Sequence, residues 1–213
     1  MTDPTIRTAL VTGASRGIGA AIAARLAREG LNVVVNYAGS EAAAVDIVSK
    51  IQADGGRAIS ARADVSDATD VKRLFDCAET EFGGIDVLVN NAGIMKLAKI
   101  EDSDDDLFDT QVAVNLKGTF NTLREASARL SDGGRIINLS TSVVGLKLET
   151  YAVYAGLKAA VETMTGIMAK EMRGRNITVN AVAPGPTATA LFLDGKPEEL
   201  VQKMSKIDRK SVV

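Results

Sequence analysis

Tyr154 and Lys158 are the residues of this sequence best suited to proton transfer. They lie four residues apart in a stretch with helical periodicity, so their side chains share one face of a helix. A free tyrosine has a pKa of about 10, and a neighbouring ammonium group stabilises the phenolate and lowers that pKa. The pair therefore predicts a general acid or base that works without histidine. Tyr151 lies nearby, but the residue four positions further on is Ala155, so Tyr151 lacks the cation.

The glycine-rich segment Thr12–Gly19 is a second candidate for chemistry, because it lies between a strand-like run and a helix-like run. Its spacing, Gly-x3-Gly-x-Gly, differs from the common GxGxxG dinucleotide fingerprint. Glycine permits a tight turn, and a helix N-terminus offers free N–H groups and a positive dipole end to a pyrophosphate. A purely structural turn is the alternative, but the place of the segment after the first strand favours dinucleotide binding.

The end of the second strand-like run bears on which dinucleotide would bind. An NAD site usually has an acidic residue there, which holds the ribose 2′-hydroxyl. This strand ends Val35-Asn36-Tyr37, without a carboxylate. Arg16 in the loop and Ser40 beyond the strand could instead hold a 2′-phosphate through charge-assisted hydrogen bonds. The pattern favours NADP(H) over NAD(H), with a solvated Arg16 as the alternative interpretation.

These candidates need a scaffold, and short apolar runs alternate with alanine-rich helical stretches along the chain. The predicted strands are Ile6–Val11, Asn32–Asn36, Arg57–Ala63, Ile85–Val89, Arg135–Leu139 and Ile177–Val182. The predicted helices are Gly17–Glu29, Ser40–Ala53, Ala68–Glu81, Asp104–Leu130 and Ala152–Arg173. Nearly continuous apolar strands are typical of a parallel sheet covered on both faces. We therefore expect one α/β domain with a Rossmann-type, doubly wound parallel sheet of six strands.

Composition narrows the class of protein further. The chain has 213 residues, 46% hydrophobic and 24% charged, with a net charge of −2, which argues against nucleic-acid or membrane binding. Cys77 is the single cysteine, which excludes a disulfide framework and favours a cytoplasmic location. The sequence has no histidine, which removes histidine triads and HExxH zinc sites. The acidic run Asp102–Asp106 is interpreted as a helix cap rather than a metal loop, so no metal site is expected.

Several short motifs lie at the predicted strand ends and in the predicted helices, each at a characteristic place along the chain. They are Thr12–Gly19, Asp64-Val65, Asn90-Asn91-Ala92-Gly93, Asn115, Ser142, Tyr154-Ala155-Gly156-Leu157-Lys158 and Pro184-Gly185 with Thr189. Together they resemble the short-chain dehydrogenase/reductase family, of the type that includes bacterial 3-oxoacyl-[acyl-carrier-protein] reductases. The resemblance extends over nearly the whole chain, to about Leu193.

The resemblance implies roles for four catalytic residues. Tyr154 would donate a proton to the substrate oxygen during reduction, while the cofactor delivers hydride to the carbonyl carbon. Lys158 would bind the nicotinamide ribose and lower the tyrosine pKa. Ser142 would polarise or position the carbonyl oxygen, and Asn115 would hold a water that continues the proton path.

The choice of serine depends on the neighbouring sequence. Ser140 is a rival to Ser142 for this role, and Thr141 is a weaker one. Ser142 is preferred because the Val143-Val144-Gly145 that follows it matches the segment after the catalytic serine of the family.

The resemblance and the loop pattern together assign cofactor contacts. Asp64 and Val65 would contact adenine, and Asn90, Ala92 and Gly93 would line the adenosine ribose and the nearby backbone. The full set of expected cofactor-binding residues is Gly13, Ser15, Arg16, Gly17, Ile18, Gly19, Asn36, Ser40, Asp64, Val65, Asn90, Ala92, Gly93, Tyr154, Lys158, Gly185, Thr187 and Thr189.

The sequence departs from the family pattern at its end. The family continues with a substrate-covering segment, another helix and a seventh strand, whereas this chain ends at Val213. We expect residues 1–193 to form the dinucleotide-binding domain and residues 194–213 a lid remnant or polar tail. The run Ile177–Val182 would then be an edge strand without a further neighbour.

The expected function is an NADPH-dependent carbonyl reductase that acts on a ketone, an aldehyde or a 3-oxoacyl group. The alternative is a non-catalytic NADP(H)-binding protein or an inactive, shortened family member. Assembly as a homodimer or homotetramer is expected through the helices Asp104–Leu130 and Ala152–Arg173. The expected apolar wall of the substrate pocket comprises Met95, Leu97, Val143, Val144, Leu146 and Leu191 to Leu193.

Overall fold

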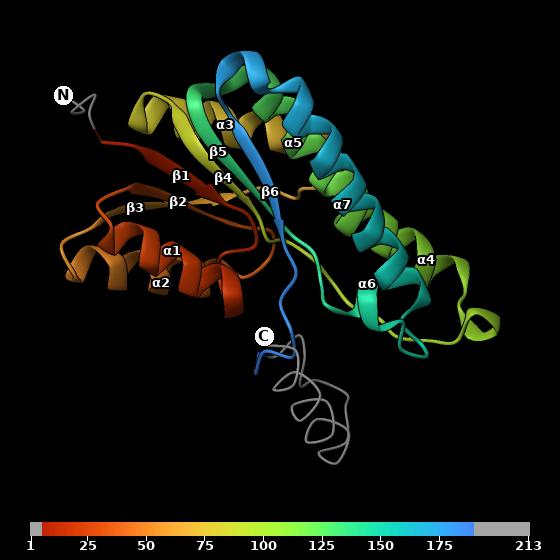
Figure 1. Ribbon diagram of the computed structural model, residues 1–213. Coiled ribbons are helices and arrows are strands. Elements are labelled where there is room, and N and C mark those ends of the chain that lie inside the picture. Colours follow the sequence, from red (N-terminus) through yellow and green to blue (C-terminus); the bar gives the residue numbers. More distant parts are fainter. Residues whose placement is uncertain (1–5, 190–213) are drawn as a thin grey trace.

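A parallel β-sheet lies between two layers of helices in the computed structural model, which describes residues 6–189 (Figure 1). The strands are β1 (Thr8–Val11), β2 (Asn32–Tyr37), β3 (Arg57–Arg62), β4 (Ile85–Asn90), β5 (Leu130–Leu139) and β6 (Thr178–Val182). They pair in the order β3-β2-β1-β4-β5-β6, and every neighbouring pair is parallel. The predicted Rossmann-type, doubly wound sheet of six strands is confirmed for this part of the chain.

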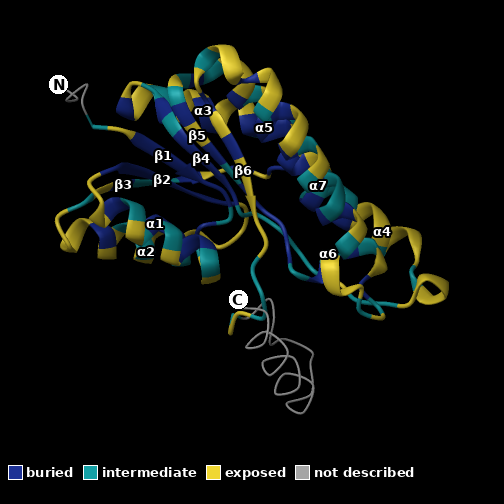
Figure 2. Cartoon of the chain, in the orientation of Figure 1, coloured by how far each residue is buried: buried dark blue, intermediate teal, exposed yellow. Residues whose placement is uncertain are grey.

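Helices cover the two faces of the sheet. The main ones are α1 (Gly17–Arg28), α2 (Glu41–Ala53), α3 (Ala68–Phe82), α5 (Gly118–Arg129) and α7 (Ala152–Glu171). Alternate strand residues point to opposite faces. Leu10 and Val34 therefore lie in the core beneath α3, α5 and α7, whereas Val11 and Val35 lie in the core beneath α1 and α2. Figure 2 shows β1, β2 and β4 buried and each helix exposed along its outer side, whereas the edge strand β6 is largely exposed. Burial on both faces explains the nearly continuous apolar sequence of these three strands.

The long helix predicted over Asp104–Leu130 is a rod of three parts. These are α4 (Asp105–Gln111), a π-helical segment (Val112–Lys117) and α5. Asp104 caps the rod, because its Oδ1 accepts a hydrogen bond from the backbone N–H of Leu107 at 2.8 Å. The interpretation of the acidic run as a helix cap is confirmed.

The start of β5 differs from the prediction. Leu130 was expected to end a helix, but it begins β5 and pairs with Ile85. The register then shifts before Val87 pairs with Arg135, and Gly133 within the shifted stretch has a φ of +77°. A glycine in this left-handed region lets the chain turn inside the strand, which a pattern of apolar residues does not reveal. Short helical elements that the sequence did not indicate are α6 (Val143–Leu146) and the 3₁₀ turns Ile100–Asp102 and Arg173–Arg175.

A chain of buried polar side chains links two helices through the sheet. Thr122 of α5 donates a hydrogen bond to Asn90 at 2.7 Å, and Asn90 donates to Asn138 at 2.8 Å. Asn138 donates to Thr165 of α7 at 2.8 Å, and Thr165 donates to the carbonyl of Val161 at 2.7 Å. Because every member is satisfied, the chain fixes β4, β5 and the two helices in one mutual register.

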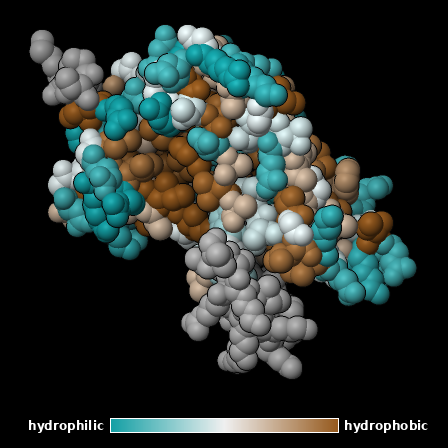
Figure 3. All heavy atoms as spheres, viewed as in Figure 1, coloured by the Kyte–Doolittle hydropathy of each residue, from teal (hydrophilic) through white to brown (hydrophobic). Residues whose placement is uncertain are grey.

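β6 is the edge strand of the described sheet, as expected. Within residues 6–189 it pairs only with β5, and Val182 is 48% exposed. Figure 3 shows hydrophobic residues gathered between α1 and β6, where no helix of the described part lies over the sheet in Figure 1. The predicted tail, residues 194–213, and the pocket residues Leu191 to Leu193 lie outside the described residues.

Candidate active site

The loop between β1 and α1 is held by two asparagines from neighbouring strand ends. Asn36 Oδ1 accepts a hydrogen bond from the N–H of Gly13 at 3.1 Å. Asn91 Nδ2 donates to the carbonyl groups of Thr12 and Gly13 at 2.9 and 3.0 Å. Gly13 has a φ of +60°, and a Cβ at Gly19 would collide with Asn91 Nδ2 and with the Gly13 carbonyl. The glycine spacing therefore follows from this close approach of two loops.

This loop forms one wall of a cleft of about 330 Å³ along the carboxyl ends of the strands. The expected cofactor-binding residues that line this cleft are Gly13, Ser15, Arg16, Gly17, Ile18, Asn36, Ser40, Asp64, Val65, Ala92, Gly93 and Thr189. The first turn of α1 has no acidic residue, and Arg16 precedes it. A helix N-terminus that lacks acidic side chains and carries an arginine suits an anionic pyrophosphate, so these residues fit a dinucleotide.

Asn90 and Gly19, which were also expected to bind the cofactor, are not among the residues that line the cleft. The Asn90 side chain turns inward and joins the polar chain between Thr122 and Asn138. Asn91, the next residue, faces the cleft instead and was absent from the expected set. Because successive residues at a strand end point to opposite sides, the alternation of β4 could have indicated Asn91. The other lining residues that the sequence did not single out are Tyr37, Ala38, Gly39, Ala63, Ile94 and Val114.

The Asn36 side chain lines the cleft but is fully engaged by the main chain. Besides accepting from Gly13, it donates from Nδ2 to the carbonyl groups of Ala63 at 3.0 Å and Ala61 at 3.2 Å. The residue is 1% exposed. Asn36 therefore positions the glycine loop against β2 and β3.

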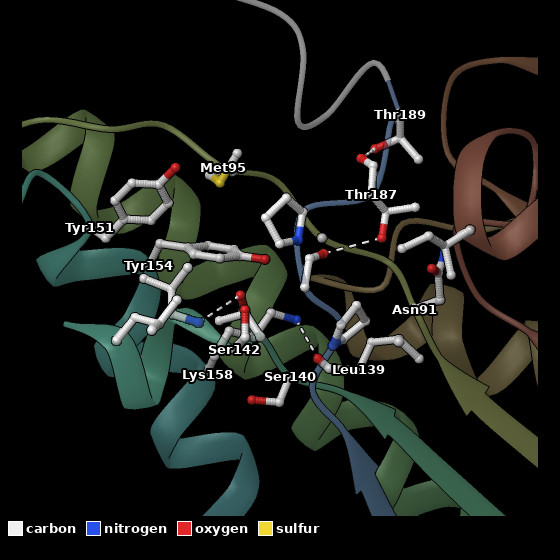
Figure 4. A pocket seen from close by; sticks show the side chains of 18 residues that line it. Asn91, Met95, Leu139, Ser140, Ser142, Tyr151, Tyr154, Lys158, Thr187 and Thr189 are labelled. Atoms are coloured by element: carbon white, nitrogen blue, oxygen red, sulfur yellow. Dashed lines mark hydrogen bonds between the residues drawn. The ribbon is translucent and has the colours of Figure 1, made fainter. Parts of the chain in front are cut away.

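A second pocket adjoins the cleft, and Ile18, Asn91, Gly93 and Thr189 line both. The expected residues that line the second pocket also include Ser142, Tyr154, Lys158, Gly185 and Thr187. Figure 4 shows the side chains of Tyr154, Ser142 and Lys158 around the same space. The structure thus brings together residues of α7, the β5–α6 connection and the segment after β6.

Lys158 is a buried amine held by one carbonyl group. It is 4% exposed, and its Nζ donates a hydrogen bond to the carbonyl of Leu139 at 2.7 Å. Burial lowers the pKa of Lys158 to about 8, because the charged form loses hydration. An ammonium group has three donors, and the contact with Leu139 uses one of them.

Tyr154 differs from the expectation in its acidity. Burial, with a smaller contribution from Tyr151, raises the pKa of Tyr154 to about 12. The Lys158 Nζ lies 6.0 Å from the centre of the Tyr154 ring. Loss of phenolate hydration therefore outweighs the attraction of the amine in this arrangement, and the expected lowering of the pKa is wrong for it. At neutral pH the phenol is protonated and is able to donate.

The two candidate serines have different partners. Ser140 Oγ donates to Glu162 Oε1 at 2.5 Å, so its hydrogen is engaged away from the pocket centre. Ser142 lies at the start of α6, and its hydroxyl takes no part in capping that helix. Thr141 Oγ1 accepts from the N–H of Val143 at 3.3 Å. Of the three, Ser142 has the hydroxyl best placed to meet a ligand.

Asn115 lies in the π-helical segment and clamps the turn after β4. Its Oδ1 accepts from the N–H of Ile94 and its Nδ2 donates to the Ile94 carbonyl, both at 2.9 Å. A Cβ at Gly93 would lie 3.0 Å from Asn115 Oδ1 and 3.8 Å from Lys158 Nζ. Asn115 and Lys158 therefore flank Gly93 on the floor of the site.

A glycine-lined cleft that opens into a pocket with a protonated phenol, a buried amine and a free hydroxyl can move a proton to or from a carbonyl oxygen. Such a cleft lies where an open parallel sheet places its ligands, at the point where the strand order reverses. Fold and site together define a dinucleotide-dependent oxidoreductase.

The chain belongs to the short-chain dehydrogenase family, whose model matches residues 7–199. It is 45% identical over 206 residues to a short-chain type dehydrogenase/reductase of Picea abies, covering 92% of this chain and 76% of the relative. It is also 45% identical to an NADPH-dependent aldehyde reductase-like chloroplastic protein of Arabidopsis thaliana, covering 93% and 79%. A short-chain dehydrogenase of Burkholderia cenocepacia solved with NADP is 37% identical, with a TM-score of 0.87 and coverage of 92% and 81%. None of these three names specifies a 3-oxoacyl substrate.

No helix among residues 6–189 combines the length and the apolar character that crossing a bilayer needs.

The serine assignment can be tested with two single variants. Ser142→Ala is expected to lower kcat/KM for a carbonyl substrate by about 10² to 10³, because one donor to the developing oxyanion is lost. Ser140→Ala is expected to lower kcat/KM less, and to reduce the free energy of unfolding by about 1 kcal/mol through the lost bond to Glu162. Steady-state kinetics and urea unfolding measure the two effects. The reverse order of activities would assign the role to Ser140.

The buried amine predicts a pH dependence of stability. The folded pKa of Lys158 is about 8 and its ordinary value is 10.5, so between them the folded protein binds fewer protons than the unfolded chain. The free energy of unfolding is therefore expected to rise between pH 8 and 10, by about 2 kcal/mol. Above pH 10 the raised pKa of Tyr154 acts in the opposite direction, because the folded protein keeps that proton. Urea unfolding from pH 7 to 10 measures the rise, and Lys158→Met should lack it. An equal rise in both proteins would contradict the assignment.

Proposed function

We propose that this chain is an NADPH-dependent reductase that converts the carbonyl group of a small ketone or aldehyde to an alcohol. The observation that carries the proposal is the convergence of Tyr154, Lys158 and Ser142 on one pocket that shares a wall with the glycine-lined cleft. The cofactor supplies the hydride when bound. The chain itself has to hold the carbonyl, exclude water and provide the proton.

The proton source in this proposal is Tyr154. With its pKa raised to about 12, the phenol keeps its proton at neutral pH, which is the form that reduction requires. Ser142 would donate a hydrogen bond to the same carbonyl oxygen and hold it near the phenol. The buried state of Tyr154, 8% exposed, limits exchange of that proton with bulk water.

Lys158 and the cleft would hold the cofactor. The two donors of Lys158 that Leu139 does not use would bind the hydroxyl groups of the nicotinamide ribose. Asp64 and Val65 would contact the adenine, and Gly185, Thr187 and Thr189 the nicotinamide end. Asn115 would act as a positioning residue through Ile94, and as the site of the water that extends the proton path.

The preference for NADP(H) over NAD(H) is supported by the wall around the end of β2. Arg16 and Ser40 both line the cleft beside Asn36 and Tyr37, and neither Asn36 nor Tyr37 carries a carboxylate. A guanidinium and a hydroxyl that line the same cleft suit a 2′-phosphate. The names of the NADPH-dependent relative and of the NADP-bound structure agree with this preference.

A homodimer or homotetramer is proposed from the outer faces of the long helices. Phe108 of α4, Phe120 of α5 and Ile167 of α7 are 49%, 47% and 53% exposed. Large apolar side chains exposed on neighbouring helices are typical of contact surfaces between subunits.

A cytoplasmic location is proposed from the single cysteine, Cys77, which is exposed and unpaired.

The reductase can be tested by comparing Tyr154→Phe with the parent chain on ketones, aldehydes, quinones and a 3-oxoacyl thioester. The variant is expected to lower kcat/KM by about 10³, because the proton donor is removed. Fluorescence titration should show unchanged NADPH binding, since the phenol is small beside the whole cofactor contact. Binding of NADPH without turnover by the parent chain would support the alternative, a non-catalytic NADP(H)-binding protein or an inactive, shortened family member. Turnover that ignores Tyr154→Phe would contradict the proposed proton donor.

The cofactor preference can be tested with Arg16→Ala. This variant is expected to raise the Kd for NADPH about tenfold or more, through loss of charge-assisted hydrogen bonds, and to change the Kd for NADH little. Arg28→Ala is the matched control, because Arg28 carries the same charge on α1 and lies outside the cleft. Equal losses for both nucleotides, or equal effects of both substitutions, would contradict a 2′-phosphate contact at Arg16.

A further inference from the structure

Tyr151 is a buried phenol on the wall of the pocket that contains Tyr154. It is 6% exposed and belongs to the apolar cluster formed with Val143 and Tyr154, against which Met95 and Leu97 pack. Figure 4 shows Tyr151 beside Met95, on the same side of the pocket as Tyr154. Its place in the wall is set by the start of α7, because Tyr151 is the residue immediately before that helix.

The hydroxyl of Tyr151 has no hydrogen-bond partner among residues 6–189. Buried polar groups in folded proteins are nearly always hydrogen-bonded, and a buried tyrosine hydroxyl usually finds a partner. The described part of the chain has only one other buried side-chain atom of this kind, Asn32 Oδ1. Asn32 begins β2 and lines neither pocket, whereas Tyr151 lines the pocket of the reacting groups. The unpaired hydroxyl therefore belongs to a side chain on the wall of the candidate substrate pocket.

The side chains that pack with Tyr151 in its cluster are hydrophobic apart from the Tyr154 hydroxyl, whereas Ser140, Thr141 and Ser142 line another part of the same pocket. Met95, Val143 and Leu146 supply hydrophobic surface to the same pocket, with Pro184 and Pro186 on the segment after β6. Burial raises the pKa of Tyr151, so the phenol is neutral and keeps its donor hydrogen. Tyr151 and Tyr154 belong to the same side-chain cluster and line the same pocket. A substrate held at Tyr154 would therefore lie near the Tyr151 hydroxyl, in a mainly hydrophobic part of the pocket wall.

We propose that Tyr151 is a substrate-specificity residue, which hydrogen-bonds a second oxygen of the substrate near the carbonyl that Tyr154 protonates. The inference rests on the proposed function and narrows its substrate class. The preferred substrates are carbonyl compounds that are apolar over most of their surface and carry a hydroxyl, ether or further carbonyl oxygen on the same ring system or chain. An unsubstituted ketone of the same shape would leave the Tyr151 hydroxyl unpaired and would be the poorer substrate.

The test uses the full chain, NADPH, 1-tetralone and the series of its monohydroxy positional isomers. In the parent chain, at least one isomer is expected to have a kcat/KM about tenfold above that of 1-tetralone. Tyr151→Phe should abolish this ratio by lowering kcat/KM for the favoured isomer, with little change for 1-tetralone. The comparison within each protein cancels the effect of the variant on the chemical step.

Stability and inhibition measurements keep the test decisive. Removal of an unpaired buried hydroxyl is expected to leave the Tm of Tyr151→Phe unchanged or to raise it, whereas a structural hydrogen bond would lower it. If tetralones are not reduced, inhibition constants against the best carbonyl substrate are compared in the same way. The proposal is overturned if no isomer is preferred, if Tyr151→Phe affects all compounds equally, or if the Tm falls.

Failure of the proposed role of Tyr151 can be distinguished from failure of the proposed reductase function. If the parent chain reduces no carbonyl compound, the proposed function fails, whatever Tyr151 does. If carbonyl compounds are reduced and Tyr154→Phe prevents it, while the isomer preference is absent, only the role of Tyr151 fails.

Discussion

The close contact between the loop after β1 and the loop after β4 is the constraint on which the site depends. The sheet winds in opposite directions from these two strands, so a crevice opens between them at their carboxyl ends. Asn91 bridges the crevice by donating to the carbonyl groups of Thr12 and Gly13. Side chains larger than hydrogen at Gly13 or Gly19 would push the loops apart. The backbone N–H groups at the start of α1 keep their direction toward the cleft only while this contact holds.

Dehydration dominates the acid–base behaviour of the neighbouring pocket. Tyr154 and Lys158 both shift toward their neutral forms, to pKa values of about 12 and about 8. At neutral pH the phenol is uncharged and most of the amine is still protonated, so the two groups are not an ion pair at rest. Burial therefore keeps the proton on the phenol oxygen. The amine lies in the range where a small change in its surroundings alters its charge.

The sequence predicted the parallel sheet, the order of its elements and most residues of both pockets, because strand ends and helix starts are visible in apolar periodicity and glycine spacing. It did not predict which of Asn90 and Asn91 faces the cleft, although the alternation of side chains along β4 could have indicated Asn91. The π-helical segment around Asn115 and the glycine turn within β5 follow from tertiary packing that periodicity does not report. The pKa of Tyr154 depends on its buried surface, which spacing from a lysine cannot measure.

The polar chain through β4 and β5 has a direction. From Thr122 to Asn90, Asn138, Thr165 and the Val161 carbonyl, each group gives its hydrogen to the next, and the last acceptor belongs to the backbone. Since Thr165 gives its hydrogen to the Val161 carbonyl, Asn138 presents Nδ2 to Thr165 and Oδ1 to Asn90, which sets the orientation of both amides in this arrangement. Replacing any one member with an apolar residue leaves its neighbour buried without a hydrogen-bond partner. A substitution at one of these four side chains therefore has to be compensated at the next one along the chain.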